Sequence, residues 1–226
     1  MTTIRAVGFD LDGTLFDHVG AATVGVNAFL GRLGVSPTDA IRSLWFLAEE
    51  ECHALWKAGR ITFQEQRRLR LQTFLPAIGV EVPETSDALD HLFEQYLREY
   101  TVAWRPFPDA ADVLASIRHS GIRVGVLTNG SQRQQVEKLK AIGLFNLVDV
   151  VCTAEGIGVW KPDSQSFAIL AEQLGVSACE CLFVGDHPDQ DIAGALAAGM
   201  QALIVDHYRE GSEGLSAALE LIRTNK

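Results

Sequence analysis

From Arg105 onwards, short apolar runs alternate along the chain with longer segments of helical periodicity. The apolar runs predict buried strands over 123–127, 148–152, 181–184 and 202–205, and the segments between them predict helices. Strands joined by helices of this length form right-handed crossovers, which place the strands parallel in one sheet with helices on its faces. We therefore expect an α/β fold built on a doubly wound parallel sheet.

A further apolar run at Ile4–Phe9 predicts the first strand of the same sheet. Between this strand and residue 105 the periodicity is helical, broken only by turn residues. We expect a Rossmann-like core formed by residues 1–16 and 105–226, and a smaller all-helical domain over 17–104, inserted after the first strand.

Several helices carry expected start and stop signals. Thr62 begins a capping box whose helix should end before Pro76, because the residue preceding a proline is disfavoured in helical conformation. Asp109, Asp163 and Asp189 each precede a predicted helix and could cap it through a side-chain oxygen.

The first strand ends in two carboxylates, Asp10 and Asp12, followed at once by Gly13. Side chains two residues apart on an extended backbone point to the same side, so both carboxylates can face one small volume. They repel there unless a cation lies between them or one of them holds a proton. Both arrangements suit phosphoryl transfer, in which a metal neutralises phosphate oxygens, one carboxylate is the nucleophile and the other carries a proton.

Polar residues also follow the next two predicted strands, at the sheet edge where open α/β sheets bind ligands. Thr128-Asn129-Gly130 precedes a helix and could either cradle an anion or cap that helix. Lys161, held in place by Pro162, could neutralise a nucleophilic carboxylate and a phosphate oxygen together. A surface lysine in a loop is the alternative for Lys161.

The fourth of these strand ends carries three carboxylates within six residues, at Asp186, Asp189 and Asp191. Such a group is best explained by a cation, and Mg²⁺ prefers hard oxygen ligands. We expect His187 to pack beside this site and not to bind the metal.

The segment Asp10-Leu11-Asp12-Gly13-Thr14-Leu15 resembles the first motif of the haloacid dehalogenase superfamily, most of whose members are magnesium-dependent phosphatases. Thr128-Asn129-Gly130, Lys161-Pro162, and Gly185-Asp186 with Asp191 resemble its second, third and fourth motifs, in the same order. The helical insert resembles the cap that closes over the active site in some members.

The resemblance implies a set of catalytic residues, namely Asp10, Asp12, Thr128 and Lys161. Asp10 would attack phosphorus to form an aspartyl phosphate, and Asp12 would act first as general acid and then as general base. Thr128, Asn129 and Lys161 would bind the phosphoryl oxygens.

The resemblance also implies a bound Mg²⁺ as cofactor. Its ligands would be the side chains of Asp10 and Asp186 and the backbone carbonyl of Asp12, with Asp191 in the outer shell.

Alternatives to a phosphatase remain open. A 2-haloacid dehalogenase needs no acid two residues after its nucleophile, and such members lack the second aspartate, so Asp12 disfavours this interpretation. A phosphomutase keeps all four motifs, so the motifs do not exclude it. A non-catalytic binder would show the loss of a catalytic residue in its sequence, and none is lost here.

The substrate is expected to be a small phosphate monoester such as a nucleoside monophosphate, a sugar phosphate or a phosphoglycolate-like acid. Four arginines gather in or beside one helix of the insert, at Arg60, Arg67, Arg68 and Arg70. We expect most of them to form a solvated helix face and one to contact the leaving group.

Charge and composition limit the partners and the compartment. A formal net charge of −10 without any basic run argues against nucleic acid as a partner. No uncharged apolar run approaches membrane-spanning length and no signal peptide is recognisable, so we expect no membrane partner and a cytoplasmic protein. A monomer or weak homodimer is expected.

Overall fold

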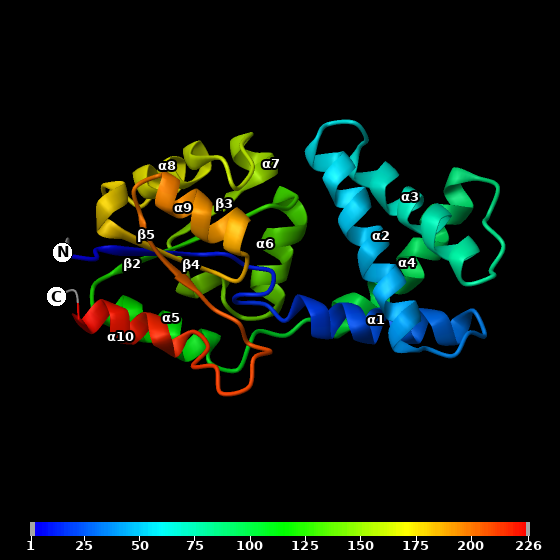
Figure 1. The fold of residues 1–226 in the computed structure, drawn as a ribbon, viewed down its shortest axis with the longest axis horizontal. Coiled ribbons are helices and arrows are strands. Elements are labelled where there is room, and N and C mark those ends of the chain that lie inside the picture. Colours follow the sequence, from blue (N-terminus) through cyan, green and yellow to red (C-terminus); the bar gives the residue numbers. More distant parts are fainter. Residues whose placement is uncertain (1–2, 225–226) are drawn as a thin grey trace. The chain divides into compact units, whose positions relative to one another are not determined.

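The computed structural model describes residues 3–224 and divides into two compact units. The sheet unit comprises Met1–His18 and Trp104–Lys226, and the helical unit comprises Val19–Ala103 (Figure 1). The boundaries expected from the sequence, at 17 and 104, lie within two residues of these divisions.

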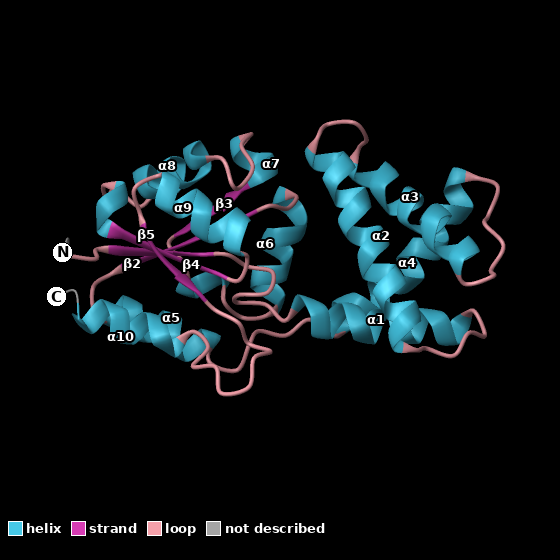
Figure 2. Cartoon of the chain, viewed as in Figure 1, coloured by secondary structure: helices cyan, strands magenta, loops and turns pink. Residues whose placement is uncertain are grey.

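The sheet unit contains, within the described residues, one parallel sheet, whose strands are magenta in Figure 2. The strand order is β3-β2-β1-β4-β5. The strands are β1 (Ala6–Phe9), β2 (Arg123–Thr128), β3 (Val150–Thr153), β4 (Cys181–Gly185) and β5 (Gln201–Ile204). β1 is central and pairs in parallel with both β2 and β4. The predicted parallel, doubly wound sheet is therefore confirmed.

Helices cover both faces of this sheet. On one face lie α5 (Ala110–His119) and α10 (Ser216–Thr224), which contact each other, and on the opposite face lie α8 (Ser164–Gln173) and α9 (Gly194–Ala197) (Figure 1). The helices that follow β2 and β3 directly are α6 (Gln132–Ala141) and the short α7 (Ala154–Ile157). Every residue of β1 and β4 is buried, as expected for central strands covered on both faces.

Over the residues that the structure describes, the sheet unit also contains two short 3₁₀ turns and one π-helical segment. The 3₁₀ turns are η1 (Phe145–Leu147) and η2 (Ala178–Glu180), and the π-helical segment is η3 (Pro188–Ala193). Where the sequence predicts one helix over 189–198, the structure has η3 followed by α9. The N-cap of η3 is His187, whose Nδ1 accepts hydrogen bonds from the backbone N–H groups of Asp189 and Gln190, so Asp189 is not the cap.

The helical unit consists of α1 (His18–Arg32), α2 (Asp39–Lys57), α3 (Phe63–Ala77) and α4 (Ser86–Val102), with His18 itself assigned to the sheet unit. Trp45 lies at the centre of its aromatic core, with ring centroids 5.0 Å from Phe74, 4.5 Å from Tyr96 and 6.2 Å from Phe93. Buried aromatic rings of this kind supply much of the apolar area that holds a small helical unit together. No helix among the described residues is long and apolar enough to cross a membrane.

The capping box at Thr62 and Glu65 is present as predicted, with each side chain accepting from the other residue's backbone N–H. The predicted end of this helix before Pro76 is wrong, because α3 continues through Pro76 to Ala77. A proline in the last turn removes only one backbone hydrogen bond, and the chain leaves the helix where Gly79 adopts a φ of +73°.

Candidate active site

The carboxyl ends of β1, β2 and β4 lie side by side in the sheet and bring together residues far apart in the sequence. Asp10 follows β1 directly, Thr128 ends β2, and Asp186 follows β4. All are in the sheet unit, as are the remaining candidate residues Asp12, Asn129, Lys161 and Asp191.

Three carboxylates form an acidic cluster, defined here as Asp10, Asp186 and Asp191, with one oxygen of each lying within 4.8 Å of the others. Asp10 and Asp191 are buried, whereas Asp186 is exposed. Like charges this close repel each other, so the cluster favours a cation or a proton between them.

Lys161 supplies one positive charge to the acidic cluster. Its buried ammonium Nζ lies 2.5 Å from Asp10 Oδ1 and 2.5 Å from Asp191 Oδ1. Asn129 holds the lysine backbone in place, because its Oδ1 accepts from the Lys161 N–H at 2.8 Å and its Nδ2 donates to the Lys161 carbonyl at 2.9 Å. The sequence predicted a role for Asn129 towards phosphate, but not this clamp on the loop.

Burial raises the pKa of Asp10 well above its ordinary value; Lys161 opposes this rise, while Asp191 and Asp186 add to it. Burial also raises the pKa of Asp186, and Asp191 reinforces that rise. Lys161 shows the opposite balance, since burial would lower its pKa but the carboxylates of Asp10 and Asp191 raise it above the ordinary lysine value. The lysine therefore stays charged. Its single positive charge does not balance the negative charges of the carboxylates in the acidic cluster.

The donor set of the acidic cluster fits a magnesium ion. Asp191 is already engaged, because Oδ1 accepts from Lys161 and Oδ2 accepts from the His187 backbone N–H at 3.0 Å. Within the described residues, Oδ2 of Asp10 and Oδ2 of Asp186 accept no hydrogen bond from another side chain. Hard oxygens from two carboxylates, with a third available through water, are what Mg²⁺ takes in proteins.

Gly13 allows Asp186 to approach this loop. Gly13 has a φ of +97°, and a Cβ at this position would overlap the Asp186 carboxylate. Thr14, one residue on, donates from its hydroxyl to Asp186 Oδ1 at 3.3 Å. The glycine after the second aspartate is thus needed both for backbone conformation and for space.

Asp12 lies apart from the acidic cluster and contacts helix α6. Gln135 Nε2 donates to Asp12 Oδ2 at 2.7 Å, and the ammonium of Lys138 forms an ion pair and hydrogen bond with Asp12 Oδ1. Burial would raise the pKa of Asp12, but Lys138, His18 and the two hydrogen bonds outweigh it, so the pKa lies below its ordinary value. Asp10 and Asp12 thus each have a lysine of their own, Lys161 for Asp10 and Lys138 for Asp12.

The sequence predicts a helix over 131–142 but does not single out Gln135 and Lys138 as functional residues. A signal was present: both are polar, yet they share the buried face of α6 with Leu139. Polar residues at helical spacing on a face that packs inward indicate a buried polar contact.

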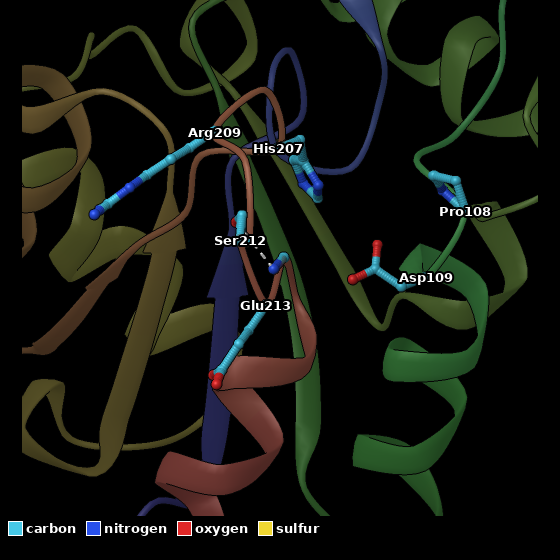
Figure 3. Close-up of a pocket in the computed structure, with 8 residues that line it drawn as sticks. Pro108, Asp109, His207, Arg209, Ser212 and Glu213 are labelled. Atoms are coloured by element: carbon cyan, nitrogen blue, oxygen red, sulfur yellow. Dashed lines mark hydrogen bonds between the residues drawn. The ribbon is translucent and has the colours of Figure 1, made fainter.

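A pocket of about 250 Å³ lies elsewhere in the sheet unit, lined by Pro108, Asp109, His207, Arg209, Ser212 and Glu213 among others (Figure 3). Two of its polar side chains, His207 and Asp109, form hydrogen bonds to the backbone. His207 Nε2 donates to the Thr14 carbonyl at 2.9 Å, and Asp109 Oδ2 accepts from the Leu215 N–H at 2.8 Å. Asp109 therefore does not cap α5 with its side chain as predicted, because its carboxylate ties the loop before α10 instead.

The four arginines of the helical unit do not form the expected solvated face. Arg70 is buried and donates to Glu49 at 2.9 Å, and Arg68 forms two hydrogen bonds with Asp90. Arg67 lies over the Phe63 and Phe93 rings. Arg60 is exposed, and its guanidinium has no hydrogen bond or ion pair with any described residue.

Comparison with known proteins places these motifs in context. A family model described as haloacid dehalogenase-like hydrolase matches residues 4–199. Phosphatase MT3486 of Mycobacterium tuberculosis (strain CDC 1551 / Oshkosh) is 36% identical over 218 residues, which cover 94% of this chain and 92% of that protein. Ribulose-1,5-bisphosphate 5-phosphatase of Halopiger xanaduensis is 30% identical over 224 residues, covering 94% and 89%.

Solved structures agree on the architecture. The crystal structure of the HAD-hydrolase YfnB from Bacillus subtilis, bound to magnesium, has a TM-score of 0.82 at 21% identity and covers 98% of this chain and 100% of that one. At this level of identity the match shows the shared fold.

Proposed function

Because the chain belongs to the haloacid dehalogenase-like hydrolase family, we propose that it is a magnesium-dependent phosphatase that hydrolyses a small phosphate monoester. The observation that carries the proposal is the Asp12 carboxylate beside Thr128, linked to it through Gln135. A proton carrier next to the phosphate-binding hydroxyl is what cleavage of an alkyl phosphate needs.

The proposed reaction has two steps. In the first, an Asp10 oxygen attacks phosphorus, the ester P–O bond breaks, and the leaving alkoxide takes a proton from Asp12. In the second, water attacks the phosphorus of the aspartyl phosphate, Asp12 takes a proton from that water, and the bond between phosphorus and Asp10 breaks. Asp12 is therefore protonated and deprotonated once in each turnover.

The phosphoryl oxygens would be bound by Thr128, the Asn129 N–H and Lys161. Lys161 already contacts the proposed nucleophile Asp10, so it can balance charge as phosphorus is attacked. Asp10, the Asp12 backbone carbonyl, Asp186 and, through water, Asp191 would hold Mg²⁺. When bound, the ion acts as a Lewis acid that withdraws charge from the phosphoryl oxygens and orients them.

Two alternatives are tested by the same assay. A 2-haloacid dehalogenase would need neither the proton carrier Asp12 nor a metal, so retention of Asp12 in a hydrogen-bonded position favours the phosphatase. A phosphomutase would use the same four motifs and would transfer the phosphoryl group to a second substrate hydroxyl instead of water.

The finer assignments are proposals as well. Relatives named for ribulose 1,5-bisphosphate, phosphoglycolate and phosphoserine support a small phosphorylated metabolite as substrate. We propose Arg60 as the arginine that contacts the leaving group, because Arg68 and Arg70 are committed to Asp90 and Glu49. We also propose that the protein is cytoplasmic, in keeping with its four free cysteines. We propose a monomer or weak homodimer as its oligomeric state.

The test is phosphate release from a panel of sugar phosphates, nucleoside monophosphates, phosphoglycolate, phosphoserine and p-nitrophenyl phosphate, with and without Mg²⁺. We expect release that requires Mg²⁺ and is lost in Asp10→Asn. Arg60→Ala should raise KM for the best metabolite and leave p-nitrophenyl phosphate unaffected. Failure of every compound to release phosphate, or chloride release from 2-chloropropionate without metal, would contradict the phosphatase.

A further inference from the structure

Helix α6 presents two polar side chains, one turn apart, to the same carboxylate. Gln135 Nε2 donates to Asp12 Oδ2 at 2.7 Å, and the Lys138 ammonium donates to Asp12 Oδ1. Both oxygens of Asp12 are therefore held from one rigid element that lies more than a hundred residues away in the sequence.

The environment of the two side chains indicates that this contact is built into the fold. Gln135 and Lys138 are 3% and 2% exposed, whereas the Asp12 side chain is 31% exposed. The Lys138 ammonium also lies 4.5 Å from the centroid of the Phe16 ring. A lysine is rarely buried unless it is paired, so the buried position of Lys138 depends on Asp12. The carboxylate keeps one open side, which a substrate can reach.

Gln135 also connects Asp12 to the proposed phosphate cradle. The same Nε2 donates to Thr128 Oγ1 at 2.7 Å. Because the Thr128 hydroxyl accepts this bond, its own proton is free to point to another acceptor, such as a phosphoryl oxygen. Gly130 makes room for the arrangement, since a Cβ there would overlap the Gln135 amide.

We propose that Gln135 and Lys138 are positioning residues of the phosphatase reaction: together they fix the Asp12 carboxylate where it meets the leaving-group oxygen, and Gln135 orients the Thr128 hydroxyl towards phosphate. The inference rests on the proposed function. Neither residue touches the reacting atoms, so their effect is exerted through Asp12 and Thr128. Displacement of a catalytic group by about 1 Å can cost about a hundredfold in rate.

The test compares Lys138→Met and Gln135→Leu with wild type on two esters, the best alkyl phosphate of the panel and p-nitrophenyl phosphate. An alkoxide needs a proton to leave, whereas p-nitrophenolate leaves without one. For Lys138→Met, which contacts only Asp12, we therefore expect kcat/KM to fall about 10- to 100-fold for the alkyl ester and less than about threefold for the aryl ester. Gln135→Leu should show the same large loss on the alkyl ester and a smaller loss on the aryl ester as well, because Gln135 also orients Thr128. Because hydrolysis of the aspartyl phosphate also needs Asp12, kcat for the aryl ester should fall and a burst of p-nitrophenol should appear.

Two further variants separate positioning from folding. Lys138→Arg keeps a cationic donor and should recover activity on the alkyl ester to within about threefold of wild type. Lys140→Met is the matched control, since Lys140 is exposed on the same helix beside the Phe145 ring, and both esters should be cleaved normally. Thermal melts confirm that each variant is folded.

Other results would contradict either this proposal or the proposed function. If Lys138→Met lowers kcat/KM equally for both esters, or if neither variant lowers it for the alkyl ester, Gln135 and Lys138 do not position the proton carrier. If wild type itself releases no phosphate from any ester, the proposed function fails and this inference fails with it.

Discussion

At the candidate site, the space that a side chain would occupy matters as much as its charge. Gly13 has a left-handed φ and lies where any Cβ would overlap the Asp186 carboxylate. Gly143, just after α6, has a φ of +76°, but a Cβ at that position would meet no atom within 4 Å. The two glycines therefore share a backbone constraint and differ in whether a side chain would collide with the acidic cluster.

The prediction at this scale compares Gly13→Ala with Gly143→Ala. A residue other than glycine in the left-handed region costs about 1–2 kcal/mol, so we expect both variants to lose about this much stability in urea unfolding. Gly13→Ala should also lose phosphate release by about tenfold or more and require more Mg²⁺, because Asp186 must move. Equal activity in the two variants would show that the close approach of Asp186 is not needed.

At the scale of elements, a bidentate ion pair between Arg68 and Asp90 links helices α3 and α4. Arg68 Nε donates to Asp90 Oδ1 at 2.7 Å and a terminal nitrogen donates to Oδ2 at 2.5 Å. The hydrogen bonds from Arg68 lower the pKa of Asp90 below its ordinary value. A carboxyl group whose folded-state pKa is lowered stabilises the fold above its unfolded-state pKa, and this contribution is lost as the pH falls through the folded-state pKa.

We therefore predict that Arg68→Met lowers the Tm by about 2 °C at pH 7 and that this difference disappears in acid, as the pH falls through the lowered pKa of Asp90. Thermal melts of wild type and variant across this pH range measure it. Arg133→Met is the control, because Arg133 pairs with Glu137 within one turn of α6 on an exposed surface and should contribute nothing measurable. A Tm difference between wild type and Arg68→Met that stayed constant with pH would contradict the assignment to Asp90.

Capping illustrates how far element ends can be predicted from local sequence. The Thr62 box was predicted because all its groups lie within four residues. The roles of Asp109 and Asp189 were not, because each was decided by a competing partner. Asp109 bonds a loop more than a hundred residues away, whereas Asp189 lies inside a helical segment that His187 already caps, where the N–H groups of Asp191 and Ile192 donate to the His187 carbonyl. The end of α3 was not predicted either, because the last turn of that helix accommodates Pro76.

At the scale of the whole molecule, every proposed metal ligand belongs to the sheet unit, while Val19–Ala103 forms a unit with its own aromatic core. A ligand that binds only the folded state stabilises it by an amount that grows with ligand concentration, about 2.7 kcal/mol at a hundred times Kd. Binding of Mg²⁺ should therefore directly stabilise the sheet unit, which contains all of the proposed ligands.

We predict that saturating Mg²⁺ raises the Tm of the sheet unit by about 5–10 °C. Hydrogen exchange should slow at residues 10–14 and 185–191 and remain unchanged in α2 and α3. Asp186→Asn, which removes one proposed ligand, should abolish both effects. Protection that spread equally over the helical unit, or a Tm shift retained in Asp186→Asn, would refute this placement of the metal.

The sequence by itself determined the strands, their parallel arrangement and the residues at their tips, because continuous apolar runs and turn residues are local signals. Only the tertiary structure decided which of those residues meet. Lys161 reaches Asp10 across 151 positions, and Lys138 reaches Asp12 across 126. Such contacts depend on the sheet order β3-β2-β1-β4-β5, which brings the strand ends together, and on how the side chains pack there. A local pattern can show that Gln135 and Lys138 lie on an inward helix face, but it does not show which carboxylate they meet, so the partners of Asp12 emerged only from the fold.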